Sequence, residues 1–253
     1  MDLLYRVKTL WAALRGNHYT WPAIDISLPG NRHFHLIGSI HMGSHDMAPL
    51  PTRLLKKLKN ADALIVEADV STSDTPFANL PACEALEERI SQEMGISTSL
   101  FSTQPLWQIA MVLQATQAQK LGLRAEYGID YQLLQAAKQQ HKPVIELEGA
   151  ENQIAMLLQL PDNGLALLDD TLTHWHTNAR LLQQMMSWWL NAPPQNNEIT
   201  LPNTFSQSLY DVLMHQRNLA WRDKLCAMPP GRYVVAVGAL HLYGEGNLSQ
   251  MLR

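Results

Sequence analysis

The segment Arg232-Tyr-Val-Val-Ala-Val-Gly238-Ala-Leu-His241 carries the clearest structural signal in the chain. Its uninterrupted apolar run is typical of a strand buried on both faces of a sheet. Glycine follows at the exit of the strand, and histidine comes three residues later. Because glycine permits a close backbone approach or a positive φ, the histidine side chain can be directed over the edge of the sheet.

The same pattern occurs near the other end of the chain. Leu36-Ile-Gly38-Ser-Ile-His41-Met-Gly43 also places glycine at the end of an apolar strand and histidine three residues later. Ligands of open α/β sheets bind beyond the carboxyl ends of the strands, where both histidines would project. For one copy alone, an ordinary core histidine is the simpler interpretation. Two copies favour a shared site.

The order of the remaining elements predicts an α/β fold. Helical patterns begin at Pro105, at Asp130 (interpreted as a helix cap) and over residues 205–228, and they alternate with short apolar segments. This alternation favours a central mixed or largely parallel sheet flanked by helices, with two strand-Gly-x-x-His half-repeats. We expect one domain over residues 1–253, with a helical insertion or cap at 151–200. The predicted strands are 33–38, 63–70, 142–148 and 232–238.

Length and composition restrict the class of protein. The chain has 253 residues, of which 46% are hydrophobic, so it can bury a sizeable core. No apolar run approaches the roughly 18 residues that indicate a spanning helix. A net charge of -4 argues against a general nucleic-acid binder. Cys83 and Cys226 are too few for a disulfide framework or a multi-thiolate zinc site.

The N-terminal residues have apolar side chains at helical spacing, but Arg6 and Lys8 interrupt the apolar run that a secretory signal requires. We therefore expect an amphipathic helix over residues 1–20 that packs on the domain. Contact of residues 1–15 with a membrane surface is the alternative. We expect the protein to be cytoplasmic.

Two pairs of acidic residues lie in the predicted strands. Glu67 and Asp69 are two residues apart, as are Glu146 and Glu148, so each pair is predicted to share one face of its strand. A buried acid is costly unless it is paired, protonated or bound to a cation. Glu67, which lies earlier in its strand, is the stronger candidate. Asp69 and Glu148 could equally lie at solvated strand ends.

Arg217 and Asn218 lie within the last predicted helix, and Arg217, Trp221 and Lys224 fall near one helical face. Such an arginine is either a solvated or ion-paired surface residue, or a clamp for an anion or carbonyl that faces the histidines.

Two His-x-His pairs offer competing metal sites. His33 and His35 share one face of the first predicted strand, and His174 and His176 lie in a helical region. We interpret both pairs as exposed polar positions, although a metal at the first pair is conceivable.

In their order and spacing these motifs resemble the TraB/PrgY/GumN family, to which the Tiki proteins belong. The resemblance extends from about residue 33 to residue 252. It rests on Gly38 with His41, Val66-Glu67, Gly128-Ile-Asp130, Pro143-Val-Ile-Glu-Leu-Glu148 with Gln153, Arg217-Asn218, and Gly238 with His241. The family is also similar to erythromycin-esterase-like and haem-binding ChaN-like proteins. The resemblance implies a mixed sheet flanked by helices that brings the two histidine-bearing strands together.

The resemblance further implies a hydrolase that depends on a divalent metal, because Tiki members are metal-dependent peptidases. Our leading hypothesis is hydrolysis of a peptide bond by metal-bound water. His41 and His241 would bind Mn, Co or Zn, with Glu67 as a third ligand or as the base. Arg217 would stabilise the oxyanion. Five residues would position these groups or bind substrate: Gly38, Gly238, Glu148, Asp130 and Asn218.

Two alternatives remain open. In a metal-independent, esterase-like hydrolase His41 would be the general base, with Glu67 and His241 tuning it. In a sequestering protein without activity, one of the histidines would hold haem, or the site would bind a peptide without cleaving it. The substrate is an unspecified peptide or small molecule, and the oligomeric state is open.

Overall fold

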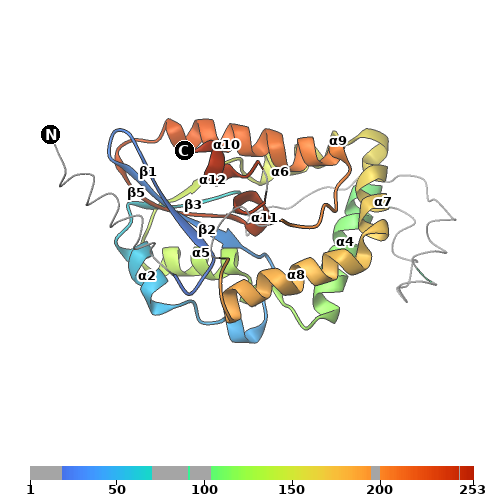
Figure 1. Cartoon of the computed structure of the whole chain (residues 1–253), viewed down its shortest axis with the longest axis horizontal. Coiled ribbons are helices and arrows are strands. Elements are labelled where there is room, and N and C mark those ends of the chain that lie inside the picture. Colours follow the sequence, from blue (N-terminus) through green and yellow to red (C-terminus); the bar gives the residue numbers. More distant parts are fainter. Residues whose placement is uncertain (1–18, 70–90, 92–103, 195–199, 245) are drawn as a thin grey trace.

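The computed structural model describes residues 19–69, 91, 104–194, 200–244 and 246–253. A five-stranded sheet of order β1-β2-β5-β3-β4 runs through its centre (Figure 1). β1 is antiparallel to β2, and the other neighbouring strands are parallel. The predicted α/β fold with a mixed sheet is therefore confirmed. The strands are β1 (Ala23–Leu28), β2 (Arg32–Ser39), β3 (Ala63–Val66), β4 (Val144–Glu146) and β5 (Gly231–Gly238).

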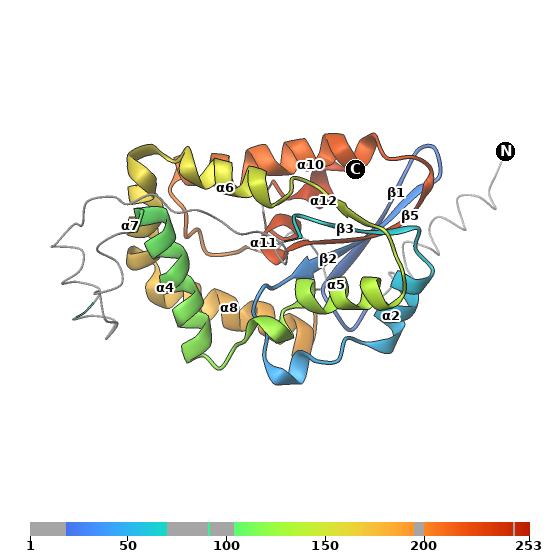
Figure 2. The same ribbon diagram turned by 180° about the vertical axis from the view of Figure 1, so that it is seen from behind.

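Helices flank both faces of the sheet (Figures 1 and 2). Short 3-10 turns lie at His45–Met47, Ala125–Tyr127 and Pro161–Gly164, and a π-helical turn lies at Asp211–His215. The α-helices are α2 (Thr52–Lys59), α4 (Leu106–Lys120), α5 (Ile129–Gln139), α6 (Ala150–Leu158), α7 (Leu165–Thr173), α8 (Trp175–Leu190), α9 (Gln207–Tyr210), α10 (Gln216–Cys226), α11 (Ala239–Leu242) and α12 (Leu248–Met251).

The apolar core consists of two clusters, one on each face of the sheet. Successive side chains of a strand point to opposite faces, so Val235 packs with α10 and α12, whereas Val234 packs with α2 and α5. Burial on both faces explains why β5 is apolar from Tyr233 to Val237.

A third apolar cluster lies beside the sheet rather than over it. It joins α4, α7 and α9 through side chains that include Trp107, Leu168 and Leu209. In Figure 1 these helices lie at the end of the molecule away from α2. Residues 150–190 are almost wholly helical, as the sequence predicts. Their role as an insertion or cap within a single domain stays a prediction.

Several predicted boundaries are wrong. The second predicted strand, 63–70, ends at Val66 because the chain leaves the sheet there and Glu67 turns toward the backbone of Gly238. Glu67 and Asp69 consequently do not share a strand face. Glu148 also lies beyond its strand, so it does not share a strand face with Glu146. The strand β1 was not predicted, although Ala-Ile-Asp-Ile-Ser-Leu has the alternation of a half-buried strand.

The helical stretch predicted over residues 205–228 is observed from Gln207 to Cys226, where α9, the π-helical turn at Asp211–His215 and α10 follow one another directly. Asp130 is not the cap of α5, which begins after Gly128. Its carboxylate instead accepts a hydrogen bond from Ser39.

The amphipathic helix expected over residues 1–20 lies almost wholly outside the described residues. Within the ranges that the structure covers, no helix combines the length and the apolarity that crossing a bilayer requires.

Candidate functional site

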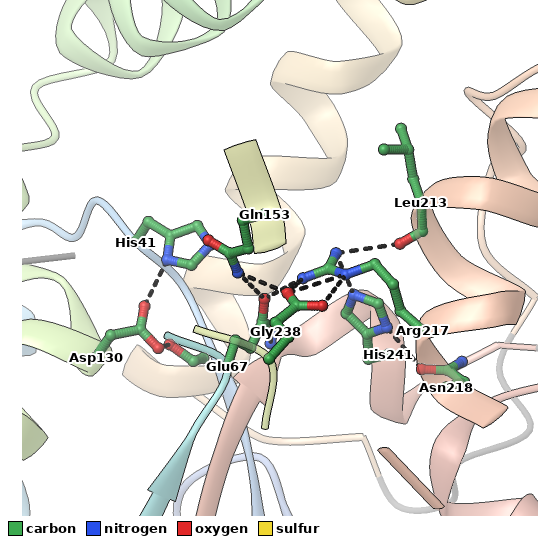
Figure 3. Close-up of polar contacts among 11 residues, drawn as sticks. His41, Glu67, Asp130, Gln153, Leu213, Arg217, Asn218, Gly238 and His241 are labelled. Carbon is green, nitrogen blue, oxygen red and sulfur yellow. Dashed lines mark hydrogen bonds and ion pairs between the residues drawn. The ribbon is translucent and has the colours of Figure 1, made fainter. Parts of the chain in front are cut away.

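The two Gly-x-x-His segments leave the sheet side by side. β2 and β5 are parallel neighbours, and Ser39 lies opposite Gly238 in their register. The segments that carry His41 and His241 therefore begin at the same edge of the sheet, as the sequence predicts. Figure 3 shows the side chains that gather there, with His41 and Asp130 on one side and Arg217 with its partners on the other.

His41 is held by Asp130. The Nδ1 atom of His41 lies 2.7 Å from Oδ2 of Asp130, and the hydroxyl of Ser39 donates to the other oxygen of that carboxylate. The His41 side chain is 73% exposed, so its ring presents Nε2 away from this partner. The charge of Asp130, and then its hydrogen bond, raise the pKa of His41 to about 9.

A glycine makes the pairing of His41 with Asp130 sterically possible. Gly128, just before α5, lies so close to the backbone of His41 that a Cβ atom there would be 2.2 Å from the His41 carbonyl oxygen. The backbone N–H of Ile129 donates to the carbonyl of Ile40 at 2.9 Å. This close approach brings the first turn of α5, and Asp130 with it, against the end of β2.

Arg217 of α10 occupies the centre of the other half of the site. Its Nη2 lies 2.7 Å from Glu67 and 2.5 Å from Glu148, and its Nε also donates to Glu148, at 3.1 and 3.2 Å. Its Nη1 donates to the carbonyl of Leu213 at 3.1 Å and lies 3.3 Å from Nε2 of His241. All five N–H donors of the guanidinium therefore have partners. The side chain is only 15% exposed, so it is not the solvated surface arginine of the alternative interpretation.

Glu67 is ionised because of these contacts. Burial alone would raise the pKa of its carboxyl, but attraction from His241, Arg217 and His41 and the Gly238 N–H hold it below its ordinary value. The Gly238 amide donates to Oε1 of Glu67 at 2.6 Å.

His241 is buried and neutral at physiological pH. Its Nδ1 lies 2.7 Å from Oδ1 of Asn218, which can only accept, so Nδ1 carries the proton. Nε2 is then an acceptor for Arg217. Burial, followed by the nearby cations, lowers the pKa of His241 to about 4 despite the opposing charge of Glu67. The ring lies 4.4 Å from that of Trp221, which also stacks under Arg217 at 4.6 Å.

The predicted metal ligands do not form one cluster. His241 and Glu67 both contact Arg217, whereas His41 is paired with Asp130. In the described part of the chain, no three His, Cys, Asp or Glu side chains are grouped so that they could hold one metal ion. The positive charge between Glu67 and Glu148 belongs to Arg217. A divalent ion on His41, His241 and Glu67 does not fit these side chains as they lie.

Three residues of the site were not singled out as site residues by the sequence. Ser39 supports Asp130, and Trp221 forms an aromatic surface behind Arg217. Gln153, which had served only as a landmark of the resemblance, donates to Glu148 at 2.7 Å and to Glu67 at 3.4 Å. Glu148 contacts Arg217 and Gln153 rather than either histidine. Among these, Gln153 had a signal as a landmark of the resemblance, and the spacing in the last predicted helix placed Trp221 near the face of Arg217.

The competing histidines lie elsewhere. His35, expected to be exposed, is buried because its ring lies between Asp25 and Trp21. His33 is exposed and pairs with Ser27.

Comparison with known proteins supports the family resemblance that the order of the motifs indicated. Residues 23–253 match the model of the TraB/PrgY/gumN family. The chain belongs to this family. It is 94% identical over 264 aligned residues to a protein of Escherichia coli (strain K12) named "Uncharacterized protein YbaP", with all of both chains covered. A Shigella flexneri relative of the same name is 93% identical over the same extent.

We predict that Arg217→Ala destabilises the fold at pH 7 by about 3–5 kcal/mol, because Glu67 and Glu148 are left buried without a counter-charge. The pKa of folded Glu67 lies below 4.5, so its ionisation stabilises the native protein above that pH and loses this effect as the pH falls. The difference in the free energy of unfolding between the variant and the wild type should therefore become smaller as the pH falls. Urea unfolding at pH 7 and pH 4 measures both effects.

Arg222→Ala is the matched control, because Arg222 lies on the same helix but forms its ion pair with the exposed Asp223. Its loss should change the free energy of unfolding by no more than about 0.5 kcal/mol. Equal stabilities of the Arg217 variant and the wild type at pH 7 would contradict the role assigned to Arg217.

Proposed function

We propose that the chain is a hydrolase in which His41, held by Asp130, activates a water molecule for attack on a peptide or ester carbonyl. The observation that carries the proposal is the geometry of this pair. Nδ1 of His41 is 2.7 Å from the half-buried carboxylate of Asp130, while the rest of the ring is exposed beside the Arg217 network. An imidazole oriented in this way can take a proton at Nε2 and return it to the leaving group.

Water is the nucleophile in this proposal. The hydroxyl of Ser39 donates to Asp130 and is not directed at His41, so Ser39 does not have the arrangement of an activated serine. His41 would accept a proton from water as the oxygen attacks the carbonyl carbon. The same proton would then pass to the departing amine or alcohol, which balances the reaction.

Arg217 would stabilise the negative oxygen that develops during attack. Its longest contact is the 3.3 Å approach to Nε2 of His241, so this contact is the one that a substrate oxygen displaces at least cost. The two glutamates would keep the guanidinium in place meanwhile. A preorganised cation in a partly buried site is worth far more than in water, because no solvent has to reorganise.

The metal-dependent hydrolase that the family resemblance implied is the competing proposal. Binding of Mn, Co or Zn by His41, His241 and Glu67 would require Arg217 to leave both His241 and Glu67. For that reason we favour the metal-independent reaction. We also propose that the protein acts in the cytoplasm on a peptide or a small ester or amide.

Asp130→Asn should lower kcat/KM about 100-fold or more at pH 9, because the amide neither orients His41 nor stabilises its protonated form. In the wild type the rate should rise with pH until His41 loses its proton near pH 9. In the variant, the pH at which the rate stops rising should move toward 6.5, since the carboxylate that raises the pKa of His41 is gone. The measurement is the pH profile of hydrolysis over a library of fluorogenic peptides and chromogenic esters.

His45→Gln is the control, since His45 is exposed and forms its ion pair with Asp46, outside the site. It should leave both the rate and the profile unchanged. If the rate of the Asp130 variant still stops rising near pH 9, the proposed role of the His41–Asp130 pair is refuted. Tight binding of library members without turnover by the wild type would instead favour a sequestering protein.

Prolonged dialysis against EDTA should leave hydrolysis unchanged, because Arg217 already supplies the positive charge between the two glutamates. Activity and bound metal should be measured on the same samples. Loss of activity that Mn, Co or Zn restores would contradict the metal-independent mechanism and establish the competing one.

A further inference from the structure

A second concave site lies at the opposite end of the sheet from the candidate active site. It is a cleft of about 1120 Å³ between the first residues of β2 and β5, the strand β1 and the helix α2. His33, which lines it, precedes Gly38 on the same strand by five residues, or about 17 Å. In Figure 1, α2 lies at the end of the molecule away from α4 and α7. The cleft is therefore separate from the groups around Arg217.

Positive side chains from two elements surround this cleft. Arg53, Lys56 and Lys57 come from α2, and Arg232 comes from β5. Within the described residues, the side chains of Arg53, Lys56 and Arg232 form no ion pair, and all three residues are exposed. The whole chain carries a net charge of -4, so this concentration of cations is local rather than a consequence of composition.

Among the residues that the structure describes, Asp25 is the one acidic residue that lines the cleft, and it already has its own partners. Asp25 accepts from Nδ1 of His35 at 2.6 Å and from the hydroxyl of Tyr19, and Lys57 lies 3.8 Å away. His35 in turn accepts from Nε1 of Trp21 at 3.1 Å, which fixes its neutral tautomer. Asp25 therefore belongs to the hydrogen-bonded floor, and the unpaired charges that face the cleft are positive.

We propose that this cleft binds a phosphate-bearing ligand. Arg53, Lys56 and Arg232 together match a group with a charge near -2 better than a single carboxylate. A guanidinium can contact phosphate oxygens through two parallel hydrogen bonds. The volume of the cleft, and the aromatic side chains of Tyr19 and Trp21 that line it, suit the attached organic part. The same chemistry is offered by soluble organic phosphates and by the headgroups of anionic phospholipids. The site is independent of the proposed hydrolase reaction.

The test uses the full chain and two probes at low ionic strength. Isothermal titration measures binding of inorganic pyrophosphate, and co-sedimentation measures binding to phosphatidylglycerol vesicles against phosphatidylcholine vesicles. In the double variant Arg53→Gln and Lys56→Gln, we expect at least one probe to bind about tenfold or more weakly, because each charge-assisted contact accounts for roughly a factor of ten. Lys59→Gln is the control, since Lys59 lies on α2 outside the cleft.

The outcomes separate the two ligand sources. Pyrophosphate binding that the double variant weakens supports a soluble phosphate. Vesicle binding that it weakens, without pyrophosphate binding, supports a lipid headgroup. The proposal is overturned if neither probe binds the wild type, or if the double variant binds both probes as well as Lys59→Gln does. Circular dichroism and the hydrolysis rate, both expected to be unchanged, confirm that the variants are folded.

Discussion

The ion pairs of Arg217 with Glu67 and Glu148 are the constraint on which the site depends. Glu67 follows β3, Glu148 follows β4 and Arg217 lies in α10, so one guanidinium joins three elements that are distant in the sequence. Removing the guanidinium would leave two largely buried carboxylates without their positive partner, which is costly. These ion pairs therefore hold the ends of β3 and β4 against α10, in addition to apolar packing.

The same network places two similar histidines in opposite states. Both follow a Gly-x-x-His pattern at the end of a parallel strand, yet His41 faces Asp130 and His241 faces Asn218 and Arg217. A carboxylate favours the imidazolium, whereas burial and a neighbouring cation favour neutral imidazole. Titratable groups whose environments separate their pKa values are typical of acid–base sites. The basis of the proposed chemistry is thus a division of roles between the histidines.

The sequence identified most of the groups but not their partners. Neighbouring parallel strands end at one edge of a sheet, so the pairing of the histidine segments could be foreseen from two patterns. The cost of a buried acid in an apolar strand pointed to Glu67. A metal or an arginine would each offset that cost, and the local sequence pattern does not distinguish between them. In the structure Arg217 of α10 contacts Glu67. The close approach at Gly128, and the turn of Glu67 out of the sheet, depend on tertiary packing that no local pattern records.

The most direct measurement is an NMR titration of the imidazole nitrogens of His41 and His241 in the intact chain. The arrangement described above predicts that His41 is protonated at pH 7 and loses its proton near pH 9. It predicts that His241 is a neutral Nδ1–H tautomer at pH 7 and gains a proton only near pH 4. Titration of both rings together near pH 6.5, or a protonated His241 at pH 7, would contradict it.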